Sequence, residues 1–442
     1  MLLKALVNSF IIKSLLILSL IFFIPINLVF IFLYFVLILF FIRININNII
    51  NYYLYFNIDI ISISLIILRL WILILIMLRQ FNINYINSLY FIFFILNLRL
   101  ILSFLTTNII IFYFFFEWSL IPIFFIIIGW GYQLERLKSR FILLMYTLFA
   151  SLPLFIIILI IRINYYLINF NFLIIINFIN LNNFYFLIIF LSFLIKFPIF
   201  FIHQWLPKAH VEAPVRGSII LAGVLLKLGG YGIIRLLFFL EKNLFIKIIM
   251  IFSLLGGRIL RIVCLINRDI KVIIAYSSVV HIALIIINLF SKNFWSINGG
   301  IIMIISHGLC SSGIFSCANI FYERSHSRII IINKNNLNYI PRITIFWFIL
   351  CIANFGGPFT YNLLREIILI IRLSFINVLL LLFIIFISFF SAVYRLILYS
   401  NIQQGTNNNL FFLINNINIR EKVNIYSHIW ILLFFLLSPI LI

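Results

Sequence analysis

The side chains of this chain that could do chemistry lie inside long apolar runs. The stretch 196–232, "KFPIFFIHQWLPKAHVEAPVRGSIILAGVLLKLGGYG", holds lysines, histidines, a glutamate and an arginine, although 66% of the chain is hydrophobic and only 9% is charged. Glu117 interrupts "IIIFYFFFEWSLIPIFFIII", and Glu366 follows "FGGPFTYNLLR". A charge at the centre of a bilayer costs at least about 2.5 kcal/mol. Such groups therefore face a bundle interior, pair with one another or become neutral.

Paired acids and bases in an apolar setting are suited to moving protons. Glu117 lies roughly 12 Å along its apolar run, and Lys227 lies roughly 20 Å beyond Pro214, at 1.5 Å of helix rise per residue. Burial favours the neutral form of each group, whereas a nearby opposite charge favours the ionised form. An acid–base pair whose separation changes can thus take up and release a proton. We expect Glu117, Lys196, Lys227 and Glu366 to carry proton transfer, with Glu117 within ion-pairing distance of Lys196.

Histidines could connect these groups, because imidazole titrates near neutral pH and both accepts and donates protons. His203 and His210 lie in the stretch quoted above, and His281 and His307 lie beside serines in "AYSSVVHI" and "MIISHGLCSS". We predict a relay through these four residues. Two alternatives stay open, namely structural hydrogen-bonded histidines and a metal site at His203 and His210, although "HQWLPKAH" lacks the HxxxH spacing of a helical metal site. The charges that we place at span ends, in loops or interfaces, are Glu135, Arg136, Glu323 and Arg324.

The elements that must position these residues are transmembrane helices. The mean hydropathy is +1.29, and apolar runs of 18 or more residues recur, each long enough to cross a hydrocarbon core of about 30 Å. These runs lack the short alternation of barrel strands, so the predicted class is an all-α polytopic membrane protein with about fourteen transmembrane helices. The predicted spans are 2–18, 20–43, 60–78, 86–106, 108–129, 141–162, 183–205, 213–236, 245–266, 270–290, 297–320, 341–369, 374–400 and 424–442.

Two of the predicted spans contain helix breakers beside an ionisable group. Pro198 follows Lys196, and Gly356-Gly357-Pro358 precedes Glu366. Non-helical backbone at membrane depth is tolerated only against protein or a water-filled cavity, and paired broken helices mark ion sites in transporters. We therefore predict two broken helices with a functional role; simple packing kinks are the alternative.

Other classes of chemistry find little support in the sequence. The four cysteines are scattered without a CxxC pair, which disfavours a metal, haem or iron–sulfur site. Neither GxGxxG nor a P-loop occurs, which disfavours nucleotide binding. We expect no cofactor and no metal in this chain. The formal net charge of +22 could indicate nucleic-acid binding. We expect no nucleic-acid partner, because much of this charge comes from arginines that fit neither the bilayer nor their surroundings.

The stretch 196–232 closely resembles the chain 4 family of mitochondrial NADH:ubiquinone oxidoreductase, respiratory complex I. Further matching stretches are "FFEWSLIPIFFIIIGWGYQLER", "DIKVIIAYSSVVHIAL", "IISHGLCSSGIFSCAN", "YERSHSR" and "NLLREI". The resemblance implies an antiporter-like subunit of the membrane arm in the mitochondrial inner membrane, with fourteen helices that include inverted five-helix repeats. The division it implies is 1–106 for the first four helices, 107–240 and 241–400 for the two repeats, and 401–442 for the last loop and helix.

The same resemblance implies roles and partners. Glu117 matches the glutamate of the fifth helix, Lys196 and Lys227 match the lysines of the seventh and eighth, and Glu366 matches the acidic residue of the broken twelfth helix. His203, His210, His281 and His307 match the histidines of a hydrated axis. The implied function is proton translocation coupled to NADH oxidation and ubiquinone reduction in other subunits, which would hold NADH, FMN, the iron–sulfur clusters and ubiquinone. Neighbouring antiporter-like subunits and lipids such as cardiolipin are the implied partners.

Several arginines fall where neither the bilayer nor the family pattern favours them. Arg216 stands in "VEAPVRGS" where the family has a small residue, isoleucine is abundant, and only five methionines occur. In invertebrate mitochondria AGA encodes serine and AUA encodes methionine. We hypothesise that the sequence reflects translation with a different mitochondrial code, and that much of the net positive charge is not native. The positions in question are Arg69, Arg79, Arg99, Arg140, Arg162, Arg216, Arg258, Arg261, Arg342, Arg365, Arg372 and Arg395. Arginines facing water or lipid headgroups are the alternative.

Two other functions remain open from the sequence alone. A stand-alone cation/proton antiporter of related fold would exchange ions without partners. A structural membrane scaffold would tolerate neutral substitutions at Glu117 and Lys227 without loss of pumping.

Overall fold

The computed structural model describes residues 59–78, 86–131, 135–165, 169–170, 183–237, 244–358, 360–376, 378–405 and 418–434. The predicted spans 2–18 and 20–43 lie outside these residues, as does Arg79. Within them the regular secondary structure is helical, apart from isolated bridges that join Asn108 to Asn169 and Asp269 to Ile329. Nine helical segments in this part are long and apolar enough to cross a membrane, which confirms the all-α polytopic class.

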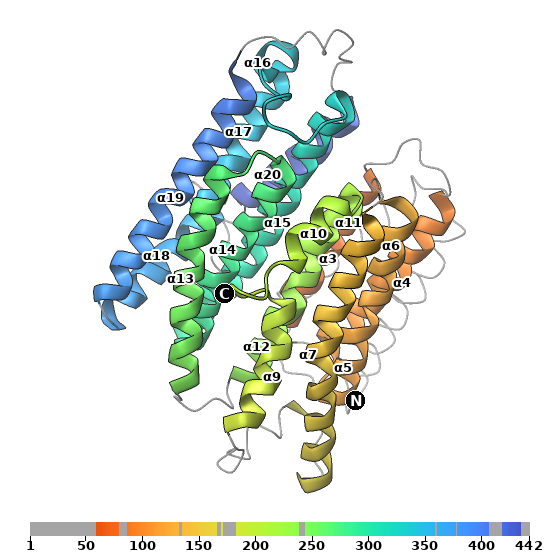
Figure 1. Ribbon diagram of the computed structural model, residues 1–442, viewed down its shortest axis with the longest axis vertical. Coiled ribbons are helices and arrows are strands. Elements are labelled where there is room, and N and C mark those ends of the chain that lie inside the picture. Colours follow the sequence, from red (N-terminus) through yellow and green to blue (C-terminus); the bar gives the residue numbers. More distant parts are fainter. Residues whose placement is uncertain are drawn as a thin grey trace, which may run out of the picture.

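The helices run roughly along one axis and form two groups around a shared centre (Figure 1). The first group comprises α3 (Ile60–Leu78), α4 (Ile86–Leu105), α5 (Ile109–Trp118), α6 (Leu120–Trp130), α7 (Arg136–Tyr165), α9 (Asn183–Lys196), α10 (Trp205–Glu212), α11 (Val215–Ile220), the π-helical turn η2 (Leu221–Leu225) and α12 (Leu226–Leu236). The second comprises α13 (Leu244–Ile266), α14 (Ile270–Phe290), α15 (Phe294–Ser325), α16 (Asn336–Tyr339), α17 (Pro341–Phe355), α18 (Tyr361–Ile376), α19 (Val378–Gln403) and α20 (Ile419–Phe434).

The central spans are the ones that carry the ionisable residues. In an 18-residue stretch of Val215–Leu236 and of Ile270–Phe290, 89% of the residues are buried, and in one of Phe294–Ser325 94% are buried. The corresponding shares are 39% for Arg136–Ile163 and 33% for Leu382–Gln403. A helix that is enclosed by other helices can carry polar groups that lipid would not tolerate. Burial of these three spans therefore explains how lysine and histidine persist in so apolar a chain.

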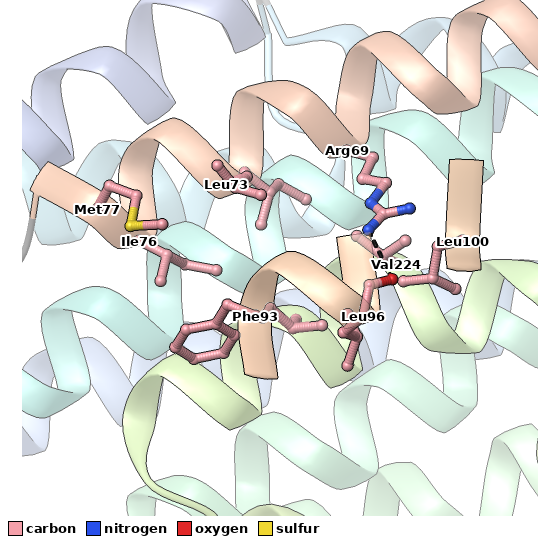
Figure 2. Close-up of a pocket in the computed structure, with 10 residues that line it drawn as sticks. Arg69, Leu73, Ile76, Met77, Phe93, Leu96, Leu100 and Val224 are labelled. Carbon is pink, nitrogen blue, oxygen red and sulfur yellow. Dashed lines mark hydrogen bonds between the residues drawn. The ribbon is translucent and has the colours of Figure 1, made fainter. Parts of the chain in front are cut away.

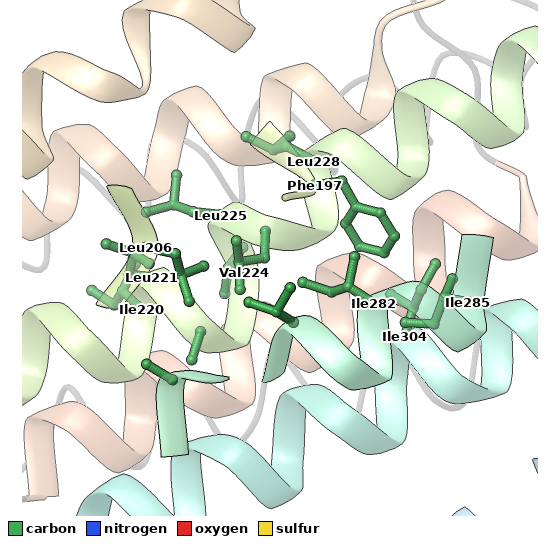
Figure 3. Close-up of a cluster of buried hydrophobic side chains, with 14 of the residues drawn as sticks. Phe197, Leu206, Ile220, Leu221, Val224, Leu225, Leu228, Ile282, Ile285 and Ile304 are labelled. Carbon is green, nitrogen blue, oxygen red and sulfur yellow. The ribbon is translucent and has the colours of Figure 1, made fainter. Parts of the chain in front are cut away.

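Buried apolar side chains pack between the central helices (Figure 3). Val224 and Leu228 of the central span meet Ile282 of α14 and Ile304 of α15 in one buried cluster. Gly229 permits the close approach of α12 to α9, since a β-carbon there would lie 2.9 Å from the Phe193 carbonyl oxygen. Small residues at such crossings allow helix backbones to pack tightly in membranes.

Both predicted breaks are present, and they shift the predicted boundaries. The span predicted at 183–205 ends as helix at Lys196, and α10 begins only at Trp205. Pro198 has no amide hydrogen to continue the helix, the Ile199 amide bonds the Leu194 carbonyl instead, and Phe201 takes a positive φ of 76°.

The second break divides the span predicted at 341–369 into α17 and α18. Gly356 ends α17 in the left-handed region, with φ of 77°. The second half then continues to Ile376, so the following helix begins at Val378 rather than at the predicted 374. A left-handed residue is a common helix terminator, and glycine adopts it without a steric penalty.

Candidate proton-transfer site

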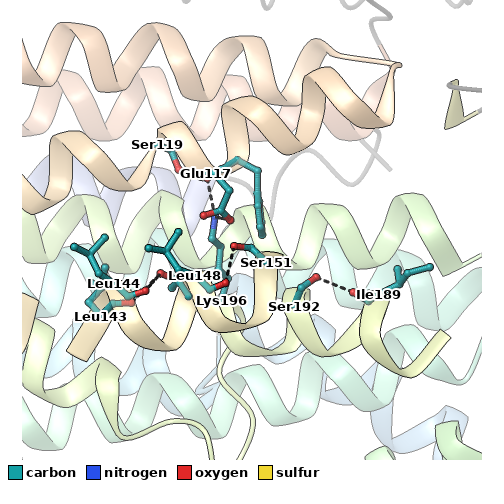
Figure 4. Close-up of polar contacts among 11 residues, drawn as sticks. Glu117, Ser119, Leu143, Leu144, Leu148, Ser151, Ile189, Ser192 and Lys196 are labelled. Carbon is teal, nitrogen blue, oxygen red and sulfur yellow. Dashed lines mark hydrogen bonds and ion pairs between the residues drawn. The ribbon is translucent and has the colours of Figure 1, made fainter. Parts of the chain in front are cut away.

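Glu117 and Lys196 form the ion pair that the sequence predicts. Lys196 Nζ lies 3.2 Å from Glu117 Oε1, and the side chains are 6% and 15% exposed respectively. Figure 4 shows the two groups pointing toward each other from α5 and the end of α9. Each buried charge would be costly alone, and together they offset much of that penalty.

Lys196 is held at the exact end of its helix by further contacts. Its ammonium donates to the Phe116 carbonyl oxygen at 2.6 Å and lies 3.1 Å from the centroid of the Phe116 ring. Beyond the break, Trp205 Nε1 donates to the Ile195 carbonyl oxygen at 3.1 Å. The helix end, where carbonyls lack intrahelical partners, is thus satisfied by a side chain of the next segment.

A π-helical turn positions Lys227, which is fully buried. Within η2 the Leu226 amide bonds the Leu221 carbonyl, five residues back. The Ala222 carbonyl, its usual acceptor, instead receives a hydrogen bond from Lys227 Nζ at 3.0 Å. Single π-helical turns inside α-helices are frequent at functional sites. Here the turn supplies a fixed partner for a buried ammonium.

Two of the predicted histidines continue from Lys227. Lys227 Nζ lies 2.8 Å from His307 Nδ1, and the rings of His307 and His281 have centroids 5.2 Å apart. These residues come from α12, α15 and α14. Lysine and imidazole in direct hydrogen-bond contact can exchange a proton, so this trio can act as a relay.

His203 and His210 do not join that trio directly. His203 stacks on Phe200, with ring centroids 5.4 Å apart, and His210 stacks on Phe315 at 4.8 Å. Both nitrogens of His210 are buried without a hydrogen-bond partner. The two rings therefore rest on separate aromatic side chains, and the geometry gives no support to a shared metal.

Glu366 lies against the second helix break. A β-carbon at Gly356 would lie 2.7 Å from the Glu366 carboxyl carbon and from Oε2. The carboxylate thus packs directly over the left-handed residue that ends α17. Lys196 is the last residue of α9, and the Glu366 side chain of α18 packs against the break that ends α17.

Residues 106–392 of the chain match the protein family described as "NADH:quinone oxidoreductase/Mrp antiporter, TM". NADH-ubiquinone oxidoreductase chain 4 of Aedes aegypti is 49% identical over 66% of this chain and 66% of that protein. The chain 4 protein of Ceratitis capitata is 43% identical over 77% of each chain. The chain belongs to the NADH-ubiquinone oxidoreductase chain 4 family. It is a proton-translocating, antiporter-like membrane subunit of mitochondrial complex I, located in the inner membrane.

Solved structures share the fold of this chain 4 family member. A chain of respiratory complex I from Thermus thermophilus superposes with a TM-score of 0.76 at 21% identity, covering 87% of this chain and 82% of that chain. A chain of the Mrp complex from Dietzia sp. DQ12-45-1b superposes with a TM-score of 0.80 at 15% identity, covering 92% and 82%. At these identities the likeness concerns the fold alone.

Sequence reasoning missed three buried polar residues of this chain 4 family member. Glu212 and Lys271, which are 5% and 3% exposed, lie at the ends of α10 and α14. His428 of α20 is fully buried, with its Nδ1 3.3 Å from the Ser312 hydroxyl of α15. Glu212 lies in the stretch 196–232, two residues after His210, and this position is the one sequence feature that could have predicted its burial. Lys271 stands at the start of an apolar run, a position typical of a lysine that faces lipid headgroups.

Four of the suspect arginines are buried in the described part of the chain, namely Arg69, Arg216, Arg261 and Arg395. Arg69 donates from Nη2 to the Leu96 carbonyl oxygen at 2.9 Å, while its Nη1 has no hydrogen-bond partner. It lines a cavity of about 20 Å³ among apolar side chains (Figure 2).

Arg261 of α13 and Arg395 of α19 are buried, with 1% and 3% of their surface exposed. Both have a buried Nε and Nη1 without a partner, and Arg395 Nη2 lies 2.6 Å from His281 Nε2. A buried guanidinium with unmet donors is strongly unfavourable. This cost is the physical argument for the translation hypothesis, in which serine stands at these positions.

Proposed function

We propose that Glu117, Lys196, Lys227 and Glu366 carry protons through this subunit, with His281 and His307 linking the two halves. The contact of Lys227 Nζ with His307 Nδ1, at 2.8 Å, carries the proposal. It places a proton donor and an acceptor in hydrogen-bond contact at the centre of the most buried spans.

The first step acts through the Glu117–Lys196 pair. While the carboxylate lies 3.2 Å from the ammonium, it stabilises the protonated lysine. When the pair separates, the buried ammonium loses that stabilisation and releases its proton toward Lys227, across bridging water. Proton affinity then follows the distance between two side chains, which conformational change in the complex can control.

The second step passes the proton across the bundle centre. Lys227 gives a proton to His307 Nδ1, and His307 releases the proton on its other nitrogen toward His281 and then Glu366. Each transfer restores the neutral imidazole, so no charge stays on the relay. His203 and His210 extend the path on the side of Lys196 in this proposal.

The number of helices, the repeats and the coupling to other subunits are proposed from membership of the family. We propose fourteen transmembrane helices with inverted five-helix repeats, divided at 1–106, 107–240, 241–400 and 401–442. Proton transfer is coupled to NADH oxidation and ubiquinone reduction in other subunits, which hold the NADH, FMN, iron–sulfur and ubiquinone sites. Exposed apolar side chains of α7, such as Met145 and Phe149, face a neighbouring antiporter-like subunit or lipids such as cardiolipin.

Lys227→Ala in the assembled complex tests the path. We expect ubiquinone reduction to continue in the presence of an uncoupler, while the number of protons moved per electron falls. A normal ratio in the assembled variant would remove Lys227 from the path and favour a scaffold role. Ion exchange by the isolated chain, reconstituted in vesicles, would instead favour a stand-alone antiporter.

A further inference from the structure

Asn362 of α18 is a buried asparagine beside the second helix break. It is 1% exposed, whereas asparagine is mostly found at protein surfaces. It precedes Glu366 by four positions, and residues four apart lie on the same face of a helix. The Asn362 and Glu366 side chains therefore leave α18 on one face, a single helical turn apart.

The Asn362 amide joins three helices at the break. Its Nδ2 donates to the Ala353 carbonyl oxygen in the last turn of α17, and it lies 3.1 Å from Cys310 Sγ of α15. The amide of Gly356, which ends α17, reaches the same Ala353 carbonyl only at a long 3.4 Å. A helix end leaves carbonyls without intrahelical partners. Asn362 therefore completes the hydrogen bonding of the turn that the break leaves open.

The amide and the Glu366 carboxyl group pack against the same turn of α17. Asn362 contacts Ala353, and the Glu366 carboxyl group lies over Gly356, three residues further along. On α15, the sulfur in contact with the amide is three residues beyond His307. Asn362 is thus one helical turn from a proposed proton carrier on its own helix, and it contacts α15 about one turn from another.

The carbonyl oxygen of the Asn362 amide is a buried acceptor that the described residues leave without a hydrogen bond. Because the Ala353 oxygen can only accept, the amide nitrogen must face it, which assigns the other amide atom as Oδ1. Buried acceptors are nearly always satisfied. An ionised carboxylate cannot donate to Oδ1, but a protonated carboxyl group can. Oδ1 is therefore an acceptor suited to the protonated form of Glu366.

We propose that Asn362 is a positioning residue for Glu366. Its Nδ2 clamps the end of α17, and its Oδ1 accepts a hydrogen bond from the protonated Glu366 carboxyl group. The inference rests on the proposed role of Glu366 and adds a partner for the state in which that acid holds a proton. Nothing in the transfer from His307 to His281 requires Asn362, so the positioning role can fail while the axis stands.

The proton balance involves one covalent bond. The Glu366 carboxylate accepts a proton from the relay and forms an O–H bond, which donates to Asn362 Oδ1. When the acid releases the proton, the O–H bond breaks and the hydrogen bond to Oδ1 is lost with it. Asn362 keeps both of its amide protons throughout, so its bond to Ala353 remains. The acid therefore titrates while the break stays in place.

Asn362→Leu tests the proposal in the assembled complex, because leucine branches at the same carbon as asparagine and has neither polar atom of the amide. We expect the number of protons moved per electron to fall to the value of Glu366→Gln. The same substitution made in Glu366→Gln should lower the ratio no further, since Asn362 acts through that acid. Should Asn362→Leu fail to assemble, Asn362→Met replaces it in every measurement, because methionine adapts to irregular space.

Infrared difference spectra supply a readout that a purely structural role does not change. The C=O stretch of protonated Glu366 is assigned by its absence in Glu366→Gln. We expect this band to move to higher wavenumber in Asn362→Leu, because the acid then lacks the acceptor for its O–H group. An unchanged band would show that water or another group accepts this hydrogen bond, and would overturn the role of Oδ1.

Asn424→Leu is the matched control. Asn424 of α20 is also buried, its Nδ2 donates to the Leu75 carbonyl oxygen at 3.2 Å, and its Oδ1 has no partner among the described residues. The acid nearest to it on α20, Glu421, is ion-paired with Arg324 at 2.8 Å. We expect Asn424→Leu to lower the unfolding temperature of the complex but to leave the ratio unchanged. Equal falls of the ratio in Asn424→Leu and Asn362→Leu would overturn the positioning role.

The outcomes separate this inference from the proposed function. A lowered ratio in Glu366→Gln with a normal ratio in Asn362→Leu overturns the positioning role and leaves the axis standing. A normal ratio in Glu366→Gln overturns both. A ratio that falls further in the double variant than in Glu366→Gln would show that Asn362 acts independently of the acid.

Discussion

The ammonium of Lys227 on α12 and Nδ1 of His307 on α15 lie 2.8 Å apart, although they are 80 residues apart in the chain. The contact joins the two helix groups at their most buried point. It forms because η2 gives the same ammonium a second partner, the Ala222 carbonyl oxygen. A carbonyl oxygen and a neutral imidazole stabilise the ammonium less than a carboxylate would, so these two contacts keep its proton available for transfer.

Removing one member of the Glu117–Lys196 pair should destabilise the subunit more than removing both. Glu117→Gln leaves a buried ammonium unpaired, and Lys196→Met leaves a buried carboxylate, each at a cost of about 3–5 kcal/mol. The double variant leaves no charge, so we expect it to unfold at a higher temperature than either single variant. Thermal unfolding of the assembled complex measures this. Destabilisations that simply add would show that the two residues do not interact.

Gly356→Ala should impair coupling through Glu366. The substitution places a β-carbon 2.7 Å from the carboxylate at a residue whose φ is 77°, so both the backbone and the acid must shift. We expect the ratio of protons to electrons to fall as it does in Glu366→Gln. Gly257→Ala is the control, because its β-carbon would meet nothing closer than 3.5 Å. An unchanged ratio in Gly356→Ala would mean that the position of the carboxylate over the break is unimportant.

Gly229→Ala should loosen the packing of α12 against α9. Its β-carbon would lie 2.9 Å from both the Phe193 carbonyl oxygen and Phe197 Cβ, and overpacking of this kind costs about 1–3 kcal/mol. We expect a lower unfolding temperature and less assembled complex. Gly129→Ala provides the comparison, since nothing lies within 4 Å of its added carbon. Equal stability of the two variants would contradict the close approach at Gly229.

Peptide mass spectrometry across "AHVEAPVRGSIIL" should find serine at position 216. The site is 7% exposed at the first turn of α11, eleven residues before Lys227. A permanent cation there would oppose cation transfer through the same field, whereas serine can satisfy first-turn amides. The same result is expected at positions 69, 261 and 395, where the guanidinium groups have unmet donors. Fragment masses that contain arginine at these positions would refute the translation hypothesis.

The sequence alone determined the class, the breaks and one ion pair of this protein. Apolar runs of bilayer length require helices, because lipid offers no partners for free backbone groups. Pro198 and Gly356 stop helices through their own covalent geometry, so their effect is local and can be read from the chain. Glu117 and Lys196 could be paired in advance because each is too costly to bury alone, and few opposite charges are available in the apolar runs.

Only the tertiary structure decided which histidine meets Lys227 and which end charges are buried. His210 precedes Lys227 by 17 positions, yet the direct contact is to His307, since η2 and the packing of α12 on α15 set that distance. Glu212 and Lys271 resemble interface charges because each stands at a helix end. They are buried because turns from both helix groups cover them. Burial at a helix end depends on which other ends pack beside it, and that is a property of the assembled bundle rather than of any single span.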